Sequence, residues 1–239
     1  MATPEMQDTN DSDRDTQTNA SSSPSGAAGG VETAAEEIPA ENLMHGDGHA
    51  AIPQIPSITS DGSIEVDELS PADFEPDDLR QRLRTMMLSR RLDEKMMTLL
   101  KQGEGHFHIG CAGHEAVQSA LSRYSRPGEG PGHDWFCFYY RDLCMALSLG
   151  MTTKEALLAH LAKADDPNSG GRQMPEHFGL KHLNVMTTAS SVGAQFNPGV
   201  GFGFGIQQRG EDSYVYISCG DGATSQGDFH EALNWAARE

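Results

Sequence analysis

The segment from residue 214 to residue 237 contains the most chemically informative pattern of the chain. A β-branched and aromatic run, Val215–Ile217, is typical of a strand, and a tight Gly220-Asp221-Gly222 turn follows it. A helical pattern comes next, so backbone N–H groups and the positive end of a helix dipole surround the turn and favour an anion. A lone carboxylate there would repel that anion unless Asp221 holds a divalent cation such as Mg²⁺ between them. The segment therefore predicts a site for a metal-bound diphosphate cofactor, although Asp-Gly alone also fits an ordinary turn.

The negative charge of the chain is concentrated at its N-terminus. The 239 residues carry a formal net charge of −18; residues 1–78 hold 18 acidic residues and one basic residue, whereas residues 79–239 are almost balanced. The N-terminal part has few aromatic residues and cannot bury enough apolar surface to offset chain entropy. We expect residues 1–75 to form a disordered acidic tail, as a solubilising extension, a docking arm or a salt adaptation, and residues 76–239 to form the folded domain.

Several classes of protein are excluded by composition. No apolar run approaches the roughly 18 residues of a membrane span, and the N-terminus lacks the basic start and apolar core of a signal peptide. No basic patch favours nucleic acid. The four cysteines form no C-x-x-C pair, which indicates reduced thiols. We expect a cytoplasmic protein without membrane or nucleic-acid partners.

Helical signals precede the glycine turn. Pro76 and Gly103 are suited to the start and the end of one helix, and Thr152 with Glu155 fits a capping box at the start of another. A helix over residues 113–122 is expected to turn Ala116, Val117 and Leu121 inward. The first helix is expected to bury an apolar stripe made of Leu79, Leu83, Met86, Met87, Met96, Met97 and Leu100.

Two further patterns have alternative interpretations. The glycines of residues 199–205 do not match G-x-G-x-x-G, so they favour a closely packed helix over a dinucleotide site. Histidine and cysteine side chains between residues 106 and 114 are possible zinc ligands, but their spacing matches no familiar zinc module. Histidines lining a polar cleft are the preferred interpretation, with zinc as the alternative. The four possible ligands are His106, His108, Cys111 and His114.

A series of motifs, in one order along residues 80–239, resembles the alpha subunits of thiamine diphosphate-dependent 2-oxo acid dehydrogenases. Residues 113–116 read GHEA, residues 139–142 read YYRD, residues 171–177 read GRQMPEH and residues 220–228 read GDGATSQGD. The pairs Asp134-Trp135 and Ser190-Ser191 and the strings 166–168 and 181–184 lie between them. The GRQMP-x-H form is most similar to the branched-chain (2-oxoisovalerate) type. The resemblance implies an α/β thiamine diphosphate-binding fold with a mostly parallel sheet flanked by helices.

The resemblance also implies roles for particular residues. Asp221 corresponds to the Mg²⁺ ligand, and His177 to a residue that meets the substrate carboxylate or a transient oxyanion. Other positions correspond to contacts with the cofactor, namely Tyr139, Tyr140, Arg141, Ser190, Ser191, Gly220, Asp221, Gly222, Ala223 and Thr224. The substrate pocket corresponds to Phe107, Tyr140, Met174, Pro175, Glu176 and His177.

The implied reaction is oxidative decarboxylation of a 2-oxo acid, with transfer of the acyl group to a lipoyl arm. The implied partners are a beta subunit, in an alpha2beta2 heterotetramer or as a fused beta half, and a lipoyl-bearing acyltransferase core. Pyruvate or acetoin as substrate, and an inactive fragment that acts only as an interaction module, remain alternatives.

Two departures from the family pattern affect these expectations. The segment after Ser191 lacks a hydroxyl residue expected of a monovalent-cation site, so potassium binding is not expected. The sequence stops at Glu239, before the strand and loop that complete the family's metal shell and carry a further catalytic histidine. We therefore expect a truncated alpha subunit, with a sheet incomplete on its C-terminal side and no decarboxylase activity by itself.

Overall fold

The structure is a computed structural model that describes residues 57–58, 64–65 and 74–239. Strands β1 (Ser57–Ile58) and β2 (Ile64–Glu65) pair antiparallel. Apart from these strands and residues 74–75, the acidic tail predicted for residues 1–75 lies outside the described residues, so its disorder stays a prediction. In the described part, no helix has both the length and the hydropathy that a bilayer crossing demands.

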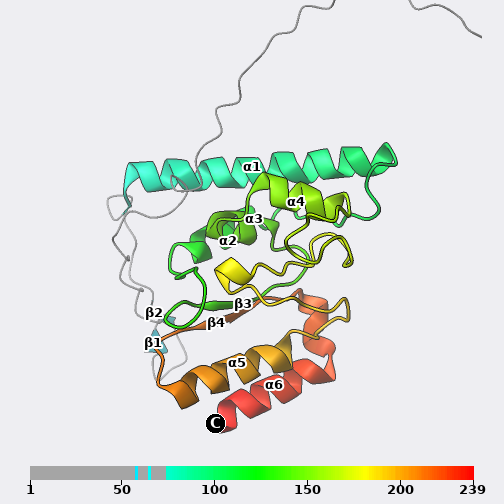
Figure 1. The fold of residues 1–239 in the computed structure, drawn as a ribbon. Coiled ribbons are helices and arrows are strands. Elements are labelled where there is room, and N and C mark those ends of the chain that lie inside the picture. The colour runs from blue at the N-terminus through cyan, green and yellow to red at the C-terminus, as the bar shows by residue number, and fades with distance from the viewer. Residues whose placement is uncertain (1–56, 59–63, 66–73) are drawn as a thin grey trace, which may run out of the picture. The chain divides into compact units, whose positions relative to one another are not determined.

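A short parallel sheet forms the centre of the domain. Strand β3 (Trp135–Cys137) pairs in parallel with β4 (Val215–Ile217), so that Phe136 lies opposite Tyr216. A parallel bridge between Phe136 and Val185 adds a third chain segment on the other edge of β3. Helices lie on both sides of these strands (Figure 1). The predicted α/β class, with a parallel sheet flanked by helices, is confirmed.

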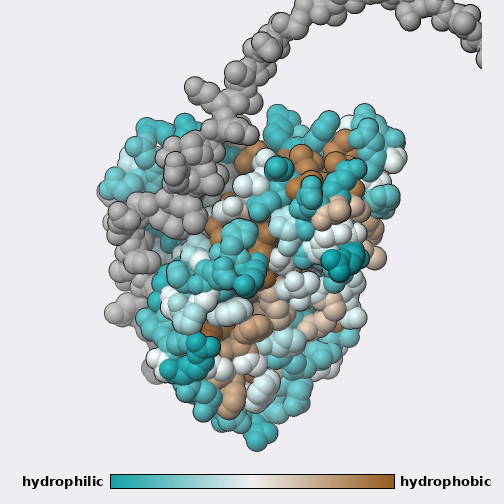
Figure 2. All heavy atoms as spheres, in the orientation of Figure 1, coloured by the Kyte–Doolittle hydropathy of each residue, from teal (hydrophilic) through white to brown (hydrophobic). Residues whose placement is uncertain are grey.

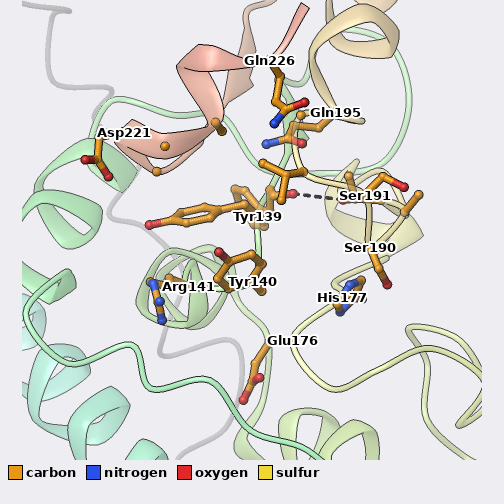
Figure 3. A pocket seen from close by; sticks show the side chains of 18 residues that line it. Tyr139, Tyr140, Arg141, Glu176, His177, Ser190, Ser191, Gln195, Asp221 and Gln226 are labelled. Atoms are coloured by element: carbon orange, nitrogen blue, oxygen red, sulfur yellow. Dashed lines mark hydrogen bonds between the residues drawn. The ribbon is translucent and has the colours of Figure 1, made fainter. Parts of the chain in front are cut away.

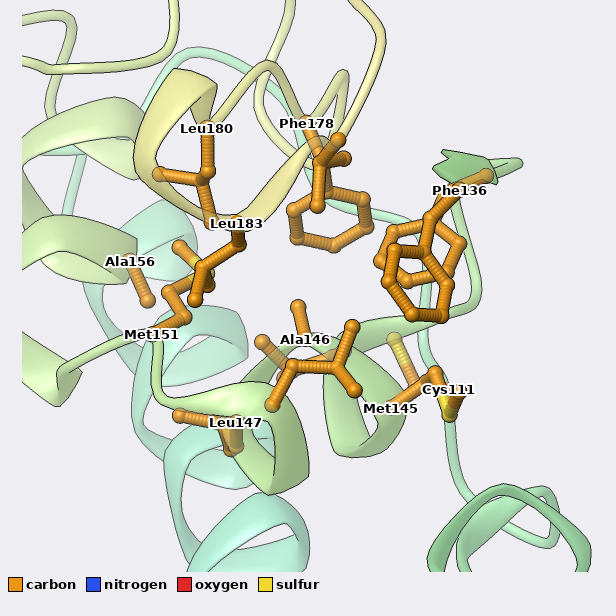
Figure 4. Packing of buried hydrophobic residues seen from close by; sticks show 14 of the residues in the cluster. Cys111, Phe136, Met145, Ala146, Leu147, Met151, Ala156, Phe178, Leu180 and Leu183 are labelled. Carbon is orange, nitrogen blue, oxygen red and sulfur yellow. The ribbon is translucent and has the colours of Figure 1, made fainter. Parts of the chain in front are cut away.

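One side of the sheet is covered by four helices, namely α1 (Pro76–Lys101), α2 (Glu115–Ser122), α3 (Leu143–Leu149) and α4 (Thr153–His160). Helix α3 is buried along almost its whole length, and Leu143, Ala146 and Leu149 have no exposed surface. A 3-10 turn, η3 (Lys181–Leu183), contributes Leu183 to the same core, where Phe178 and Phe136 also pack (Figure 4). This core holds the end of β3 against α3.

The predicted helix signals at α1 and α4 are confirmed. Pro76 begins α1, and Gly103 adopts φ +80° just beyond its end, where Glu104 N–H donates to the Leu99 carbonyl. At α4, the Thr152 hydroxyl accepts from Glu155 N–H, and the Glu155 carboxylate accepts from Thr152 N–H at 2.7 Å. The turn at Gly103 and the capping box at Thr152 each provide hydrogen-bond partners for backbone groups that a helix end leaves unpaired.

The expected apolar face of α2 was wrong. Val117 and Leu121 are 66% and 43% exposed, and Ala116 is exposed too. The helix buries polar residues instead, because Gln118 donates to Asp142 and Glu115 pairs with Arg90. A polar network therefore decides which face of α2 turns inward.

The apolar stripe expected on α1 was right only in part. Met96 is buried, at 1% exposure, together with Leu92 and Leu99. The first half of the stripe was wrong, because Leu79, Leu83 and Met87 are 45%, 55% and 58% exposed. The N-terminal half of α1 thus presents an apolar surface to its surroundings.

The other side of the sheet is covered by α5 (Phe196–Arg209) and α6 (Gly227–Arg238). Close packing at Gly199 confirms the interpretation of the glycine stretch. A Cβ atom added at Gly199 would lie 2.4 Å from Cδ1 of Ile217 and 3.4 Å from Sγ of Cys137. Only a glycine lets α5 approach both strands this closely.

This packing predicts opposite effects for two alanine substitutions in α5. Gly199→Ala should lower the free energy of unfolding by about 1–3 kcal/mol, because its methyl group overpacks against Ile217. Gly205→Ala should raise it by about 0.5–1 kcal/mol, since nothing lies within 4 Å of an added Cβ and alanine is the better helix former. Urea denaturation of the two variants measures both changes in the free energy of unfolding. Changes of the same sign and size in the two variants would contradict the close packing at Gly199.

Candidate functional site

A cavity of about 450 Å³ opens where the chain leaves the strands of the parallel sheet. Three of its walls come from the segments after β3, after the Val185 bridge and after β4, which meet at one edge because the strands are parallel; the loop before η3 adds Glu176 and His177. Figure 3 shows the lining side chains. The lining residues are Phe138, Tyr139, Tyr140, Arg141, Glu176, His177, Thr188, Ala189, Ser190, Ser191, Val192, Gly193, Gln195, Gly220, Asp221, Gly222, Ala223 and Gln226.

The buried carboxylate of Asp142 joins these segments. It accepts hydrogen bonds from Tyr139 N–H at 3.0 Å, from Gln118 Nε2 at 3.0 Å and from the Ser218 hydroxyl. The Ser218 carbonyl in turn accepts from Gln195 Nε2 at 2.8 Å. Burial raises the pKa of Asp142 to about 7, although the bonds from Ser218 and Tyr139 act in the opposite direction. One side chain therefore ties the ends of β3 and β4 to α2.

Arg141 and Tyr140 form one part of the cavity wall. The Arg141 guanidinium lies 5.2 Å from the centre of the Tyr140 ring and donates one hydrogen bond, of 2.7 Å, to the Gly110 carbonyl. The remaining N–H groups of this planar fork suit two oxygens of a phosphate. The adjacent Tyr139 hydroxyl lies 3.2 Å from Nδ1 of His114, and burial raises the pKa of Tyr139 to about 12. This wall is therefore fitted to an anion.

The glycine turn begins with a short 3-10 helix, η4 (Asp221–Ser225), and α6 starts only at Gly227. The exposed Asp221 lies at the cavity edge, and its carboxylate accepts no hydrogen bond from residues 74–239. Its oxygens are thus available to a hard cation. The Ala223 N–H donates to the Gly220 carbonyl at 3.0 Å. This N–H group is therefore already hydrogen-bonded within the turn.

His177, Ser190 and Ser191 lie away from Asp221 on the other side of the cavity (Figure 3). Nδ1 of His177 lies 3.2 Å from the Pro175 carbonyl. A carbonyl oxygen only accepts, so Nδ1 must carry the hydrogen and Nε2 of the neutral ring has a lone pair. Neutral His177 can therefore accept a proton at Nε2, and only the imidazolium can donate to an oxyanion there.

Not every predicted site residue lines this cavity. Tyr140, Glu176 and His177 do, whereas Phe107, Met174, Pro175 and Thr224 are absent from its wall. Met174 is 48% exposed, and Pro175 faces a smaller neighbouring pocket. The resemblance assigned no role to the other lining residues, although several of them are sequence neighbours of predicted ones. The unpredicted ones include Phe138, Thr188, Gln195 and Gln226.

Glu176 combines an unusual backbone with a buried carboxylate. Its backbone is left-handed, with φ of +61°. Its carboxylate oxygen Oε1 lies 2.7 Å from Nδ1 of His108. Nε2 of His108 lies 3.0 Å from Oδ1 of Asp93. Burial raises the pKa of Glu176, and the His108 hydrogen bond opposes that effect, while the two carboxylates raise the pKa of His108 against its own burial.

The zinc alternative based on residues 106–114 finds no support in the described part of the chain. His106 is exposed, Cys111 is buried with its N–H bonded to Asp93, and His114 contacts Tyr139. The described residues bring His108 together with His160 and Glu176 instead.

Comparison with known proteins agrees with the geometry of the cavity. The sequence model of the dehydrogenase E1 component family matches residues 83–238. The chain is 41% identical, over 158 residues, to the 2-oxoisovalerate dehydrogenase subunit alpha of Bacillus subtilis. This alignment covers 64% of this chain and 46% of that protein. It is 30% identical, over 180 residues, to the pyruvate dehydrogenase E1 component subunit alpha of Staphylococcus epidermidis, with coverages of 75% and 44%.

The pyruvate dehydrogenase E1 component subunit alpha of Staphylococcus aureus matches equally well, at 30% identity over 180 residues. The chain thus spans a little less than half the length of the curated relatives it matches. The family match nevertheless includes every cavity-lining residue. The chain therefore belongs to the dehydrogenase E1 component family.

Proposed function

We propose that this chain supplies the cofactor-binding part of a 2-oxo acid dehydrogenase alpha subunit, which binds thiamine diphosphate with Mg²⁺. The observation that carries this proposal is the single cavity at the carboxyl ends of the parallel strands. It collects Arg141, Asp221, Ser190 and His177 from segments far apart in the sequence. The family match implies the same cofactor.

The Arg141 side of the cavity holds the diphosphate in this proposal. The guanidinium has donors beyond the one bonded to Gly110, and it is kept in place by stacking over Tyr140. Asp221 and the exposed Gly222, on the turn after β4, line the same cavity. Two anionic groups repel each other, so Asp221 would hold a Mg²⁺ ion, and the ion would supply the positive charge that a diphosphate needs next to this carboxylate.

The side of the cavity with His177 handles the reacting atoms. When bound, thiamine diphosphate supplies an electron sink for the decarboxylation of a 2-oxo acid. The Pro175 carbonyl accepts a hydrogen bond from Nδ1–H of neutral His177. Nε2 of His177 is then the atom that takes up or returns a proton. Ser190 lies beside His177, and its hydroxyl would help to hold the part of the cofactor that reacts with the substrate.

The substrate class rests on similarity. The identity of 41% to a 2-oxoisovalerate dehydrogenase subunit, against 30% to pyruvate dehydrogenase subunits, favours a branched-chain 2-oxo acid. Pyruvate and acetoin remain the alternatives. Of the predicted substrate residues, only Tyr140, Glu176 and His177 line the cavity.

Partner subunits complete the proposal. Alpha subunits of this family pair with beta subunits, and the acyl group passes to a lipoyl-bearing acyltransferase. An apolar groove of about 370 Å³ between α2 and β4 supports such contacts, because Val117 and Leu121 leave a large hydrophobic surface exposed there. Figure 2 shows hydrophobic patches set among hydrophilic residues on the face it displays.

Cofactor binding predicts a metal-dependent gain in stability. Thiamine diphosphate with Mg²⁺ should stabilise the purified chain by about 2.7 kcal/mol at 100 times its Kd, as measured by thermal unfolding. Asp221→Asn should remove the Mg²⁺-dependent part, since a neutral amide no longer joins the cation to the protein. Asp165→Asn is the matched control, because Asp165 is exposed and does not line the cavity.

Two outcomes would count against this cofactor site. Stabilisation of Asp221→Asn equal to that of the wild-type chain would remove Asp221 as metal ligand. No stabilisation of the wild-type chain, with association with a beta subunit retained, would favour the interaction-only alternative.

The Pro175 contact predicts the tautomer of His177. At a pH of about 8.5, where an ordinary histidine is neutral, nitrogen-15 NMR of labelled chain should find the hydrogen of His177 on Nδ1. His177→Gln assigns the signal by its disappearance. A hydrogen on Nε2 instead would mean that the Pro175 carbonyl does not hold this ring, and that Nε2 donates to the cavity.

A further inference from the structure

A buried cluster of ionisable side chains lies next to the cavity and is not explained by cofactor binding. It contains Asp93 from α1, His108 from the following loop, His160 at the end of α4 and Glu176 from the loop before η3. None is more than 9% exposed. His108, His160 and Glu176 each offer one ligand atom, and these atoms lie within 4.8 Å of one another.

The first observation concerns His160, whose ring nitrogens make no hydrogen bond of good geometry in the described part of the chain. It is 0% exposed, and its only polar backbone contact there is a weak one with Met96. Buried polar groups without a well-formed hydrogen bond are rare and point to a bound water or ion. The absence of a side chain at Gly105 makes room for the ring, because a Cβ there would lie 2.5 Å from Nε2 of His160. The ring is thus held in place mainly by packing.

The second observation concerns the contact between His108 and Glu176. Nε2 of His108 faces Oδ1 of Asp93 at 3.0 Å, and Nδ1 faces Oε1 of Glu176 at 2.7 Å. A neutral imidazole has one hydrogen, so it can donate to only one of these carboxylates. The other nitrogen faces a carboxylate oxygen favourably only if it also carries a hydrogen, as in the imidazolium, or if a metal ion lies between the two atoms.

The third observation concerns charge. The carboxylate of Asp93 also accepts from Cys111 N–H, and that of Glu176 from Ile109 N–H at 3.4 Å. Within residues 74–239, neither carboxylate forms a salt bridge with a lysine or an arginine. A single protonated His108 balances one buried negative charge of the two, whereas a divalent cation balances both.

We propose that His108, His160 and Glu176 bind one divalent transition-metal ion of the zinc class. Two histidine nitrogens and a carboxylate oxygen are a common ligand set for such ions, and nitrogen ligands disfavour Mg²⁺. Asp93 then accepts the hydrogen of Nε2, as the outer partner of a metal-bound histidine usually does. Bonds of about 2 Å place tetrahedral ligand atoms roughly 3.3 Å apart, so the His108 and Glu176 atoms, which lie 2.7 Å apart, separate slightly when the ion enters between them.

Metal analysis and cobalt spectroscopy test this site in the purified chain. After treatment with a chelator, the chain should take up one Zn²⁺, and Co²⁺ in its place should give the visible absorption of a four-coordinate ion. Excess Mg²⁺ should not displace either ion. His160→Gln should weaken Zn²⁺ binding by at least 10-fold, and Asp93→Asn by about 10–100-fold. His182→Gln is the matched control, because His182 is exposed and outside the cluster.

The results separate this proposal from its alternatives. Unchanged Zn²⁺ affinity in His160→Gln would overturn it, as would loss of the ion in His106→Gln but not in His160→Gln. Should a variant fail to fold, absence of the cobalt spectrum in the wild-type chain would overturn it equally. None of these measurements uses thiamine diphosphate, so the result does not depend on the proposed function.

Discussion

The site depends on one buried carboxylate, that of Asp142. A short parallel sheet alone does not fix the loops that leave it, because loops lack a regular pattern of backbone hydrogen bonds. Asp142 supplies that order by accepting from the backbone after β3, from Ser218 after β4 and from Gln118 of α2. Tyr139 and Ser218 donate to Oδ2 and Gln118 donates to Oδ1, so the two oxygens of one buried carboxylate hold the three segments as a unit.

The same carboxylate explains the orientation of α2. Gln118 must face Asp142 and the carbonyl of Arg141, and this turns the polar side of α2 inward. The apolar side, with Val117 and Leu121, consequently faces outward beside the edge of β4. The buried polar network and the exposed apolar groove are therefore two results of one constraint, and a chain that orders its cofactor loops in this way also acquires a surface suited to protein contacts.

Features encoded by neighbouring residues could be predicted from the sequence. The capping box at Thr152, the glycine after α1 and the strand followed by Gly220-Asp221-Gly222 each depend on a few consecutive positions. The inward face of α2 could not, because hydrophobic periodicity assumes that apolar residues are buried, and a polar network reverses that here. Gln195 gave no signal either, since its role depends on Ser218, which lies 23 residues further along the chain.

Glu176 shows why a resemblance identifies a site without describing its chemistry. The GRQMPEH motif puts Glu176 and His177 side by side, yet their side chains serve different surroundings. A left-handed backbone, at a cost of roughly 1–2 kcal/mol for a residue with a Cβ, directs the Glu176 carboxylate to His108. His177 instead lies beside Ser190 in the cavity (Figure 3). A strained residue persists only where its contacts compensate, and the buried contact with His108 is the one that does so. Because Glu176 also lines the cavity, whatever occupies the buried cluster fixes part of the wall next to His177.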